Sequence, residues 1–185
     1  MHSGSPQIVF IGGNMASGKS SVAQSLAERL SKSVHLRGDL FRRMIVNGRA
    51  PMTVALSAEA QQQLQLRYDL AVETAKRYAE AGFTVVYQDI VIGAALSDMV
   101  AAFHPYRLAV VMLCPRPDVL VARDQARGKT GYSDRSMVDA FDHVLRWETP
   151  RIGYWLDNSD LTVAETADTI LAHVDHQAIG VERDG

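Results

Sequence analysis

Apolar runs alternate with amphipathic segments along most of the chain. The apolar runs are short and end close to glycine, aspartate or proline, which is typical of strands in a buried parallel sheet. They cover residues 7–12, 34–37, 83–88, 106–113 and 153–156. The intervening segments have helical spacing and predict helices from the first loop to residue 31 and over 40–46, 57–81, 95–102, 117–126, 134–147 and 163–174. This alternation predicts an α/β fold in which a parallel sheet has helices on both faces.

The longest predicted helix, residues 57–81, has clear signals at both ends. Ser57 is a candidate N-cap, and Gly82 is a typical C-terminal stop. Several apolar residues recur at a spacing that places them on one side of this helix. We expect that stripe to be buried, and it consists of Leu64, Tyr68, Ala71, Val72 and Ala75.

Composition limits the class of protein. The chain has 185 residues, 47% of them apolar and 22% charged, which fits one globular domain over residues 1–185. A net charge of −2 gives no reason to expect a nucleic acid partner. The single cysteine, Cys114, cannot form an internal disulfide, and no stretch approaches the ~20 apolar residues of a membrane span. Because residues 1–6 also lack a signal-peptide pattern, we expect a cytoplasmic protein.

Residues 13–20 read G-N-M-A-S-G-K-S, which is the G-x-x-x-x-G-K-S pattern of a phosphate-binding loop. The pattern follows a predicted strand and precedes a predicted helix, which is the context it requires. Its glycines allow successive N–H groups to point at phosphate oxygens, and the helix N-terminus adds positive potential. The predicted nucleotide-binding residues of this loop are Gly13, Asn14, Met15, Ala16, Ser17, Gly18, Lys19, Ser20 and Ser21.

Two residues of the loop have the most specific predicted roles. Lys19 would reach the β- and γ-phosphates, and the hydroxyl of Ser20 would bind Mg²⁺. The sequence therefore predicts a site for a nucleoside triphosphate, preferentially ATP, with Mg²⁺.

Two aspartates follow predicted strands, at the edge where a parallel sheet gathers its ligands. Asp89 ends the apolar run 85–88 in the Walker-B manner and is assigned to the metal, and it also lies where substrate would bind. Asp39 is the candidate base for an acceptor hydroxyl and a substrate-binding residue. Each aspartate could instead cap a helix, which leaves a structural alternative open for both.

Arginines provide further candidates. Arg42 and Arg43 follow Asp39 by three and four residues and are candidate substrate contacts, although an Asp39–Arg43 surface pair is an equally good interpretation. Arg123 and Arg127 precede a glycine-punctuated segment that we predict to be a short lid, residues 127–135. Guanidinium groups on a lid can neutralise the transferring phosphate, so both are candidate catalytic residues and Arg123 a candidate nucleotide contact. A solvated basic helix end is the alternative.

Taken together, these motifs resemble the small P-loop kinases, and most closely the chloramphenicol phosphotransferase-like group. The resemblance rests on residues 12–20, on Gly38-Asp39, on residues 89–93 and on Arg123 with Arg127. It implies a three-layer P-loop NTPase fold with five parallel strands, the phosphate loop on the central strand and a lid over the site. It further implies that Asp39 acts as the base and that Arg127 approaches the transferred phosphate.

The resemblance does not select an acceptor. Residues 39–63 should shape the acceptor pocket, and the stretch 42–63 shows no clear match to the group. Zeta-toxin-like kinases of nucleotide sugars, gluconate-kinase-like enzymes and nucleoside kinases share the same frame. The sequence also leaves open whether the chain forms a homo-oligomer.

The function predicted from these observations is an ATP- and Mg²⁺-dependent transfer of the γ-phosphate to a hydroxyl of a small molecule, with an antibiotic such as chloramphenicol as one candidate. Two alternatives remain. A regulatory ATPase or switch would use the same loop, and a polynucleotide 5′-hydroxyl kinase would need a basic channel, against which the net charge of −2 argues.

Overall fold

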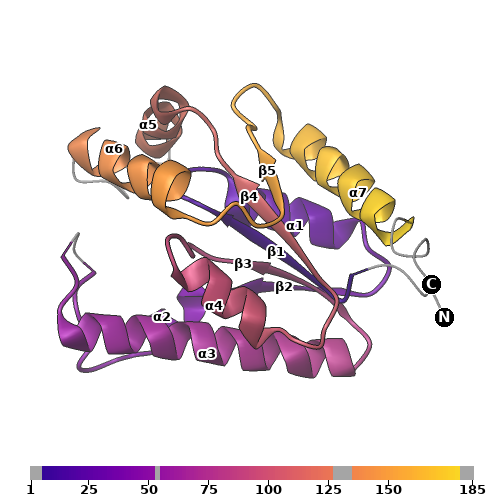
Figure 1. Cartoon of the computed structure of the whole chain (residues 1–185), viewed down its shortest axis with the longest axis horizontal. Helices are drawn as coiled ribbons and strands as arrows, with labels where there is room; N and C mark the ends of the chain where they lie inside the picture. Colours follow the sequence, from indigo (N-terminus) through magenta and orange to yellow (C-terminus); the bar gives the residue numbers. More distant parts are fainter. Residues whose placement is uncertain (1–5, 53–54, 127–134, 180–185) are drawn as a thin grey trace.

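A parallel sheet of five strands forms the centre of the computed structural model, which describes residues 6–52, 55–126 and 135–179 (Figure 1). The strand order is β2-β3-β1-β4-β5. The strands are β1 Ile8–Gly13, β2 Ser33–Arg37, β3 Thr84–Gln88, β4 Leu108–Leu113 and β5 Tyr154–Leu156. Every neighbouring pair is parallel, so the predicted α/β class and the parallel sheet are confirmed.

Strand β1 occupies the middle of the sheet. Ile8 is paired with Val85 of β3 on one side and with Leu108 of β4 on the other. All six residues of β1 are buried, as expected for a strand that has neighbours at both edges and helices on both faces. The loop that follows β1 therefore opens at the centre of the carboxyl edge of the sheet.

The helices flank this sheet on both faces (Figure 1). Their bounds are α1 Lys19–Glu28, α2 Asp39–Arg43, α3 Ala58–Glu80, α4 Ala95–Ala102, α5 Pro117–Ala126, α6 Arg135–His143 and α7 Val163–Ile179, with a π-helical turn η1 at Val144–Glu148. In the described residues no helix combines the length and the apolar character needed to cross a membrane.

Alternate residues of the strands divide the core in two. Ile8 and Phe10 face a cluster built with α3 and α4, whereas Val9 and Ile11 face a cluster built with α1 and α7. The period of two along β1 thus sends one set of side chains to each helical layer.

Helix α3 follows its sequence signals closely. The Ser57 hydroxyl accepts a hydrogen bond from the Ala60 N–H at 3.1 Å, and Gly82 follows the last turn with φ of 79°. The predicted stripe is confirmed, because Tyr68, Ala71, Val72 and Ala75 are buried and Leu64 is packed against the core.

Some helix ends differ from the prediction for local reasons. Helix α1 ends at Glu28, and the Ser33 hydroxyl donates to the Ala27 carbonyl at 2.6 Å near that end. Helix α2 ends at Arg43, before Val46, which we predicted to be helical. Val46 is 89% exposed, so its apolar side chain does not pack against the core and does not extend the helix. After α6 the helix widens to a π-helical turn, η1, and the Thr149 hydroxyl donates a hydrogen bond to the Val144 carbonyl at 2.8 Å.

Candidate active site

The phosphate loop lies between β1 and α1 and has the backbone that its glycines permit. Gly13 and Gly18 have φ of 137° and 97°, values that L side chains rarely adopt. A Cβ on Gly13 would lie 2.5 Å from the Leu113 carbonyl oxygen, so no larger residue fits there. Ala16, a non-glycine residue, also has a positive φ of 61°. Such a left-handed residue within the loop is typical of strained, ligand-binding backbone.

Lys19 folds back over the loop. Its Nζ donates to the Asn14 carbonyl at 2.5 Å, and the Ser17 N–H bonds the same carbonyl at 3.3 Å. The lysine side chain is largely buried. The ammonium group is therefore held at the hollow of the loop rather than in solvent.

The interior of the loop contains polar atoms that have no hydrogen bond within the described part of the chain. They are both side-chain polar atoms of Asn14 and the Ser17 hydroxyl. Buried polar groups are almost always paired in folded proteins, and exceptions often mark a ligand site. A bound phosphate offers several strong acceptors, so these residues fit a nucleotide phosphate.

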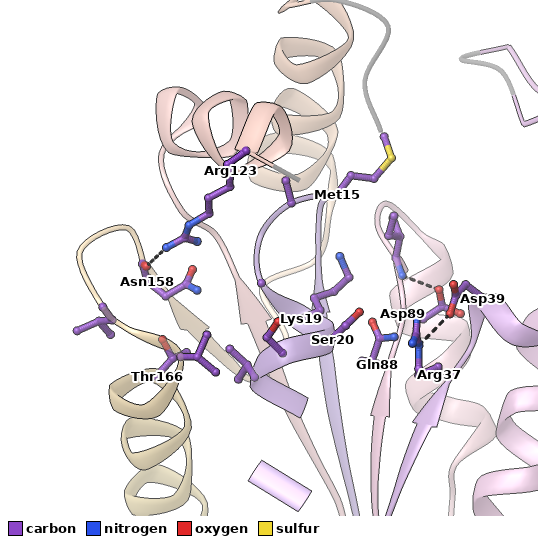
Figure 2. A pocket seen from close by; sticks show the side chains of 18 of the residues that line it. Met15, Lys19, Ser20, Arg37, Asp39, Gln88, Asp89, Arg123, Asn158 and Thr166 are labelled. Carbon is purple, nitrogen blue, oxygen red and sulfur yellow. Dashed lines mark hydrogen bonds and ion pairs between the residues drawn. The ribbon is translucent and has the colours of Figure 1, made fainter. Parts of the chain in front are cut away.

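The loop forms the floor of a cleft of about 670 Å³ (Figure 2). Residues from six segments of the chain contribute side chains to it. They include Lys19, Ser20 and Ser21 on the floor, Arg37, Asp39, Arg43, Arg67, Gln88 and Asp89 on one side, and Arg123, Asn158, Thr162 and Thr166 on the other. The structure thus brings the phosphate loop, Asp39, Asp89 and Arg123 to one cavity.

Arg123 links the phosphate loop to the segment after β5 on one wall of the cleft. Its guanidinium donates to the Asn158 carbonyl at 2.9 Å and to the Ser17 carbonyl at 3.4 Å. Asn158 in turn donates to the Ser17 carbonyl at 3.0 Å. Figure 2 shows Arg123 on the side of the loop opposite Asp39. The segment after β5 and helix α5 are therefore both fixed to the phosphate loop.

Asp39 lies on the other wall, at the start of α2. It pairs with Arg43 at 2.7 Å and with Arg37 at 3.5 Å. No side chain caps this helix, so the alternative of a capping aspartate is not what the structure shows, whereas the Asp39–Arg43 pair is present. Asp39 Oδ1 is buried and makes no hydrogen bond with the described residues, although Arg37 Nε lies 3.5 Å from it.

Asp89 is surrounded by donors. The Arg67 Nε lies 3.0 Å from Oδ2, and a second guanidinium nitrogen of Arg67 contacts Oδ1. The Tyr87 hydroxyl donates to Oδ2 at 3.1 Å, and the Ile90 N–H donates to Oδ1 at 2.7 Å. Both carboxylate oxygens are thus engaged, and a magnesium ion would have to compete with Arg67. The predicted metal role of Asp89 stays a prediction.

The position of the Asp89 carboxylate also explains why residue 38 is a glycine. A Cβ on Gly38 would lie 1.9 Å from Asp89 Oδ2, so only glycine leaves room for this carboxylate. Burial lowers the pKa of Arg67, although the neighbouring tyrosines and Asp39 favour its charge. The guanidinium remains a cation in every pH range that the fold tolerates.

We expect Asp89→Asn to lower the free energy of unfolding by about 3 kcal/mol, because the change leaves the Arg67 cation mostly buried without its counter-ion. The side chains of Asp89 and Arg67 are 0% and 13% exposed. Denaturant unfolding measures the loss, and the double variant Asp89→Leu, Arg67→Met should recover most of it. A loss of less than about 1 kcal/mol, the range of exposed pairs, would show that the pair is not important for stability.

The remaining predicted residues are placed differently from one another. Arg43 lines the cleft, but Arg42 turns away and donates to the Ala50 carbonyl at 2.7 Å. Arg127 and all of the predicted lid except Arg135 lie outside the described residues.

Sequence analysis missed Arg67 and Gln88, which line the cleft. A signal existed for Arg67, because it interrupts the apolar stripe of α3 directly before Tyr68. A charged residue at a buried position requires a partner. Gln88 carried no comparable pattern.

Comparison with known proteins supports this architecture. A family model described as AAA domain, AAA_33, matches residues 8–148. No curated protein sequence matches the chain significantly. Several solved structures share the fold at low identity, which indicates common architecture only.

Three of these structures illustrate the degree of similarity. A gluconokinase from Sinorhizobium meliloti has a TM-score of 0.67 and 21% identity over 97% of this chain and 96% of its own. A sugar kinase from Janibacter has a TM-score of 0.66 and 17% identity over 91% and 94%. An APS kinase from Mycobacterium tuberculosis, in complex with AMPPNP and APS, has a TM-score of 0.63 and 18% identity over 93% and 99%.

The family match covers most of the chain, includes the phosphate loop and Asp89, and agrees with a parallel sheet of order 2-3-1-4-5. The chain therefore belongs to the AAA domain family AAA_33 and has the P-loop NTPase fold.

Proposed function

We propose that this protein is an ATP- and Mg²⁺-dependent phosphotransferase that phosphorylates a hydroxyl group of a small molecule. The observation that carries the proposal is one cleft lined by both Lys19 of the phosphate loop and the Asp39 carboxylate. A cradle for the γ-phosphate and a proton acceptor in a common cavity are the two parts that transfer to a hydroxyl needs.

The nucleotide would lie across the phosphate loop. Backbone N–H groups of residues 13–20 and the Lys19 ammonium would hold the β- and γ-phosphates. The wall formed by Arg123, Asn158 and Thr166 lies opposite Asp39 and is the place left for the nucleoside. We therefore assign Arg123 to nucleotide binding, while a role on the transferring phosphate is assigned to Arg127 from the family resemblance.

Magnesium fits this site through few protein ligands. The Ser20 side chain lines the cleft beside Lys19, and no cluster of three His, Cys, Asp or Glu residues that could hold a metal exists among the described residues. Mg²⁺ commonly binds through one or two protein oxygens, water and substrate phosphates. When bound, it would neutralise charge on the phosphates. Ser20 is the proposed ligand, and Asp89 stays a second candidate.

Transfer would proceed by attack of the acceptor oxygen on the γ-phosphorus. A new bond forms between that oxygen and phosphorus, and the bond from phosphorus to the β,γ-bridging oxygen breaks. ADP leaves with the electron pair of the broken bond, and the hydroxyl proton passes to the Asp39 carboxylate. Arg37 and Arg43 hold the Asp39 carboxylate on the acceptor side of the cleft.

The fold itself does not choose the acceptor. The similar structures are named for a sugar, for gluconate and for APS, so different acceptors occur on one frame. Chloramphenicol is a candidate acceptor only because this chain shares motifs with the chloramphenicol phosphotransferase-like group.

The proposal is tested by incubating the protein with Mg·ATP and a panel of hydroxyl compounds, and by measuring ADP release together with the phosphorylated product by mass spectrometry. We expect acceptor-dependent ADP release with one phosphoryl group added to the acceptor. Steady ATP hydrolysis that no acceptor stimulates, but that a protein partner does, would identify a switch instead.

We expect Ser20→Ala to raise the Mg²⁺ concentration required for half-maximal activity by about 10- to 100-fold, the range seen when a metal site loses a supporting group. Titration of Mg²⁺ at saturating ATP measures this shift. Ser97→Ala, at an exposed position on α4 away from the cleft, is the matched control and should not change it. An unchanged Mg²⁺ requirement in Ser20→Ala would remove this serine from the metal site.

A further inference from the structure

A second cavity, of about 530 Å³, lies beside the cleft. Its walls come from α3, α6, η1, the start of α4 and the segments after β1, α2 and β3. Most of its lining residues are apolar, among them Met15, Leu64, Ile90, Met137, Ala140 and Phe141. Its volume is in the range of pockets that hold drug-sized ligands.

Each of the three polar residues of this pocket makes at least one hydrogen bond or ion pair with the protein. The Tyr68 hydroxyl donates to the Ile90 carbonyl at 2.8 Å, and burial raises its pKa to about 12. Arg67 is paired with Asp89, and Arg42 donates to the Ala50 carbonyl. The Arg42 Nε is a buried donor without a partner among the described residues. The pocket wall is therefore mainly apolar, and its polar groups are two arginines and one tyrosine that already contact the protein.

The pocket and the cleft share part of their walls. Met15, Arg67 and Ile90 line both. Arg67 also lines the cleft together with Asp39, so the shared wall lies on the acceptor side of the phosphate loop. A molecule seated in the apolar pocket can thus extend a hydroxyl past Arg67 toward Asp39 and the γ-phosphate.

We infer that the acceptor is an alcohol whose hydroxyl is carried by a bulky apolar body, such as a ring system, and that this body occupies the pocket between α3 and α6. The inference rests on the proposed function and specifies its substrate class. A polyol or sugar seated there would lose its hydrogen bonds to water and find few replacements. An apolar body gains from leaving water and fills the space between Leu64 and Phe141.

The first experiment compares two groups of acceptors at equal concentration with Mg·ATP. Chloramphenicol and steroid alcohols represent apolar bodies, and glycerol, glucose and gluconate represent polar ones. Product formation is measured by mass spectrometry, and binding to the protein loaded with Mg·AMPPNP is measured by calorimetry. We expect binding and transfer to be at least about tenfold better for an apolar-bodied compound than for any polar one.

The second experiment places a charge in the pocket. Ala140 lies on the exposed side of α6 yet lines the cavity, so Ala140→Asp should fold normally. We expect it to raise KM or Kd for the apolar-bodied acceptor about tenfold or more, because the carboxylate must stay hydrated. KM for ATP should not change. Ala101→Asp, at an exposed α4 position that lines neither cavity, is the matched control, and Met137→Gln is a second pocket variant.

The outcomes separate the inference from the proposed function. Failure to bind any Mg-nucleotide would overturn the proposed function itself. If nucleotide binds but a polar acceptor is preferred, or no apolar-bodied compound binds, the inference on substrate class is wrong while the nucleotide site stands. It is also wrong if Ala140→Asp and Met137→Gln both leave acceptor binding unchanged.

Discussion

Replacing Asp39 by asparagine should lower kcat by about 10²- to 10⁴-fold while Mg·ATP still binds. This is the usual loss when a general base is removed. Asparagine keeps the size of the side chain but cannot take the hydroxyl proton. Stopped-time assays with the best acceptor measure kcat, and calorimetry with Mg·AMPPNP measures nucleotide binding. The two readouts together separate a failed proton transfer from a failed site.

The Asp39 variant also weakens an ion pair, so that effect has to be measured separately. Arg43→Gln removes the 2.7 Å contact to Asp39 but leaves the carboxylate, and we expect a smaller loss of kcat, below about tenfold, since exposed pairs contribute little. Asp168→Asn removes a comparable surface pair with Arg29, at 3.0 Å, between two residues that do not line the cleft, and should leave kcat unchanged. Equal losses in Asp39→Asn and Arg43→Gln would reduce Asp39 to a structural partner of Arg43.

Local sequence signals were sufficient to predict most of the fold. Strand β1 and helix α3 can each be predicted from their own residues. Burial on both faces gives β1 a continuous apolar run, and Ser57 and Gly82 mark the ends of α3. The ends of α1, α2 and α6 were less accurate. They depend on contacts between residues such as Ser33 with Ala27 and Thr149 with Val144, and periodicity does not contain that information.

In the candidate site, too, residues that are contiguous in the sequence could be predicted, whereas contacts between distant residues could not. The phosphate loop is contiguous, so its residues and its glycines could be found from the sequence. The Arg67–Asp89 pair joins residues that are 22 positions apart, and the contact of Asn158 with Ser17 joins residues 141 apart. Such contacts exist only after α3 and β5 have packed on the sheet. The apolar pocket beside the cleft is built from still more segments, and for this reason the acceptor could not be inferred from any motif.

Lys19→Ala should reduce kcat/KM by about 10³-fold or more, the scale on which a cation that stabilises the transferring phosphoryl group contributes. The Lys19 ammonium already lies at the Asn14 carbonyl inside the loop, where the phosphates would bind. Its loss removes positive charge from both the bound nucleotide and the transition state, so affinity for Mg·ATP and kcat should fall together. Calorimetry and steady-state kinetics check the two parts separately.

A matched lysine provides the control for this variant. Lys76 on α3 pairs with Glu73 at 2.9 Å and lines neither cavity, so Lys76→Ala removes an equal charge outside the site and should leave turnover unchanged. Circular dichroism must show that Lys19→Ala keeps its secondary structure, because the buried lysine also closes the loop on itself. A folded Lys19→Ala protein with turnover within about tenfold of the original would mean that the loop does not hold the reacting phosphates, since no other described lysine lines the cleft. Transfer chemistry would then have to be sought elsewhere in the molecule.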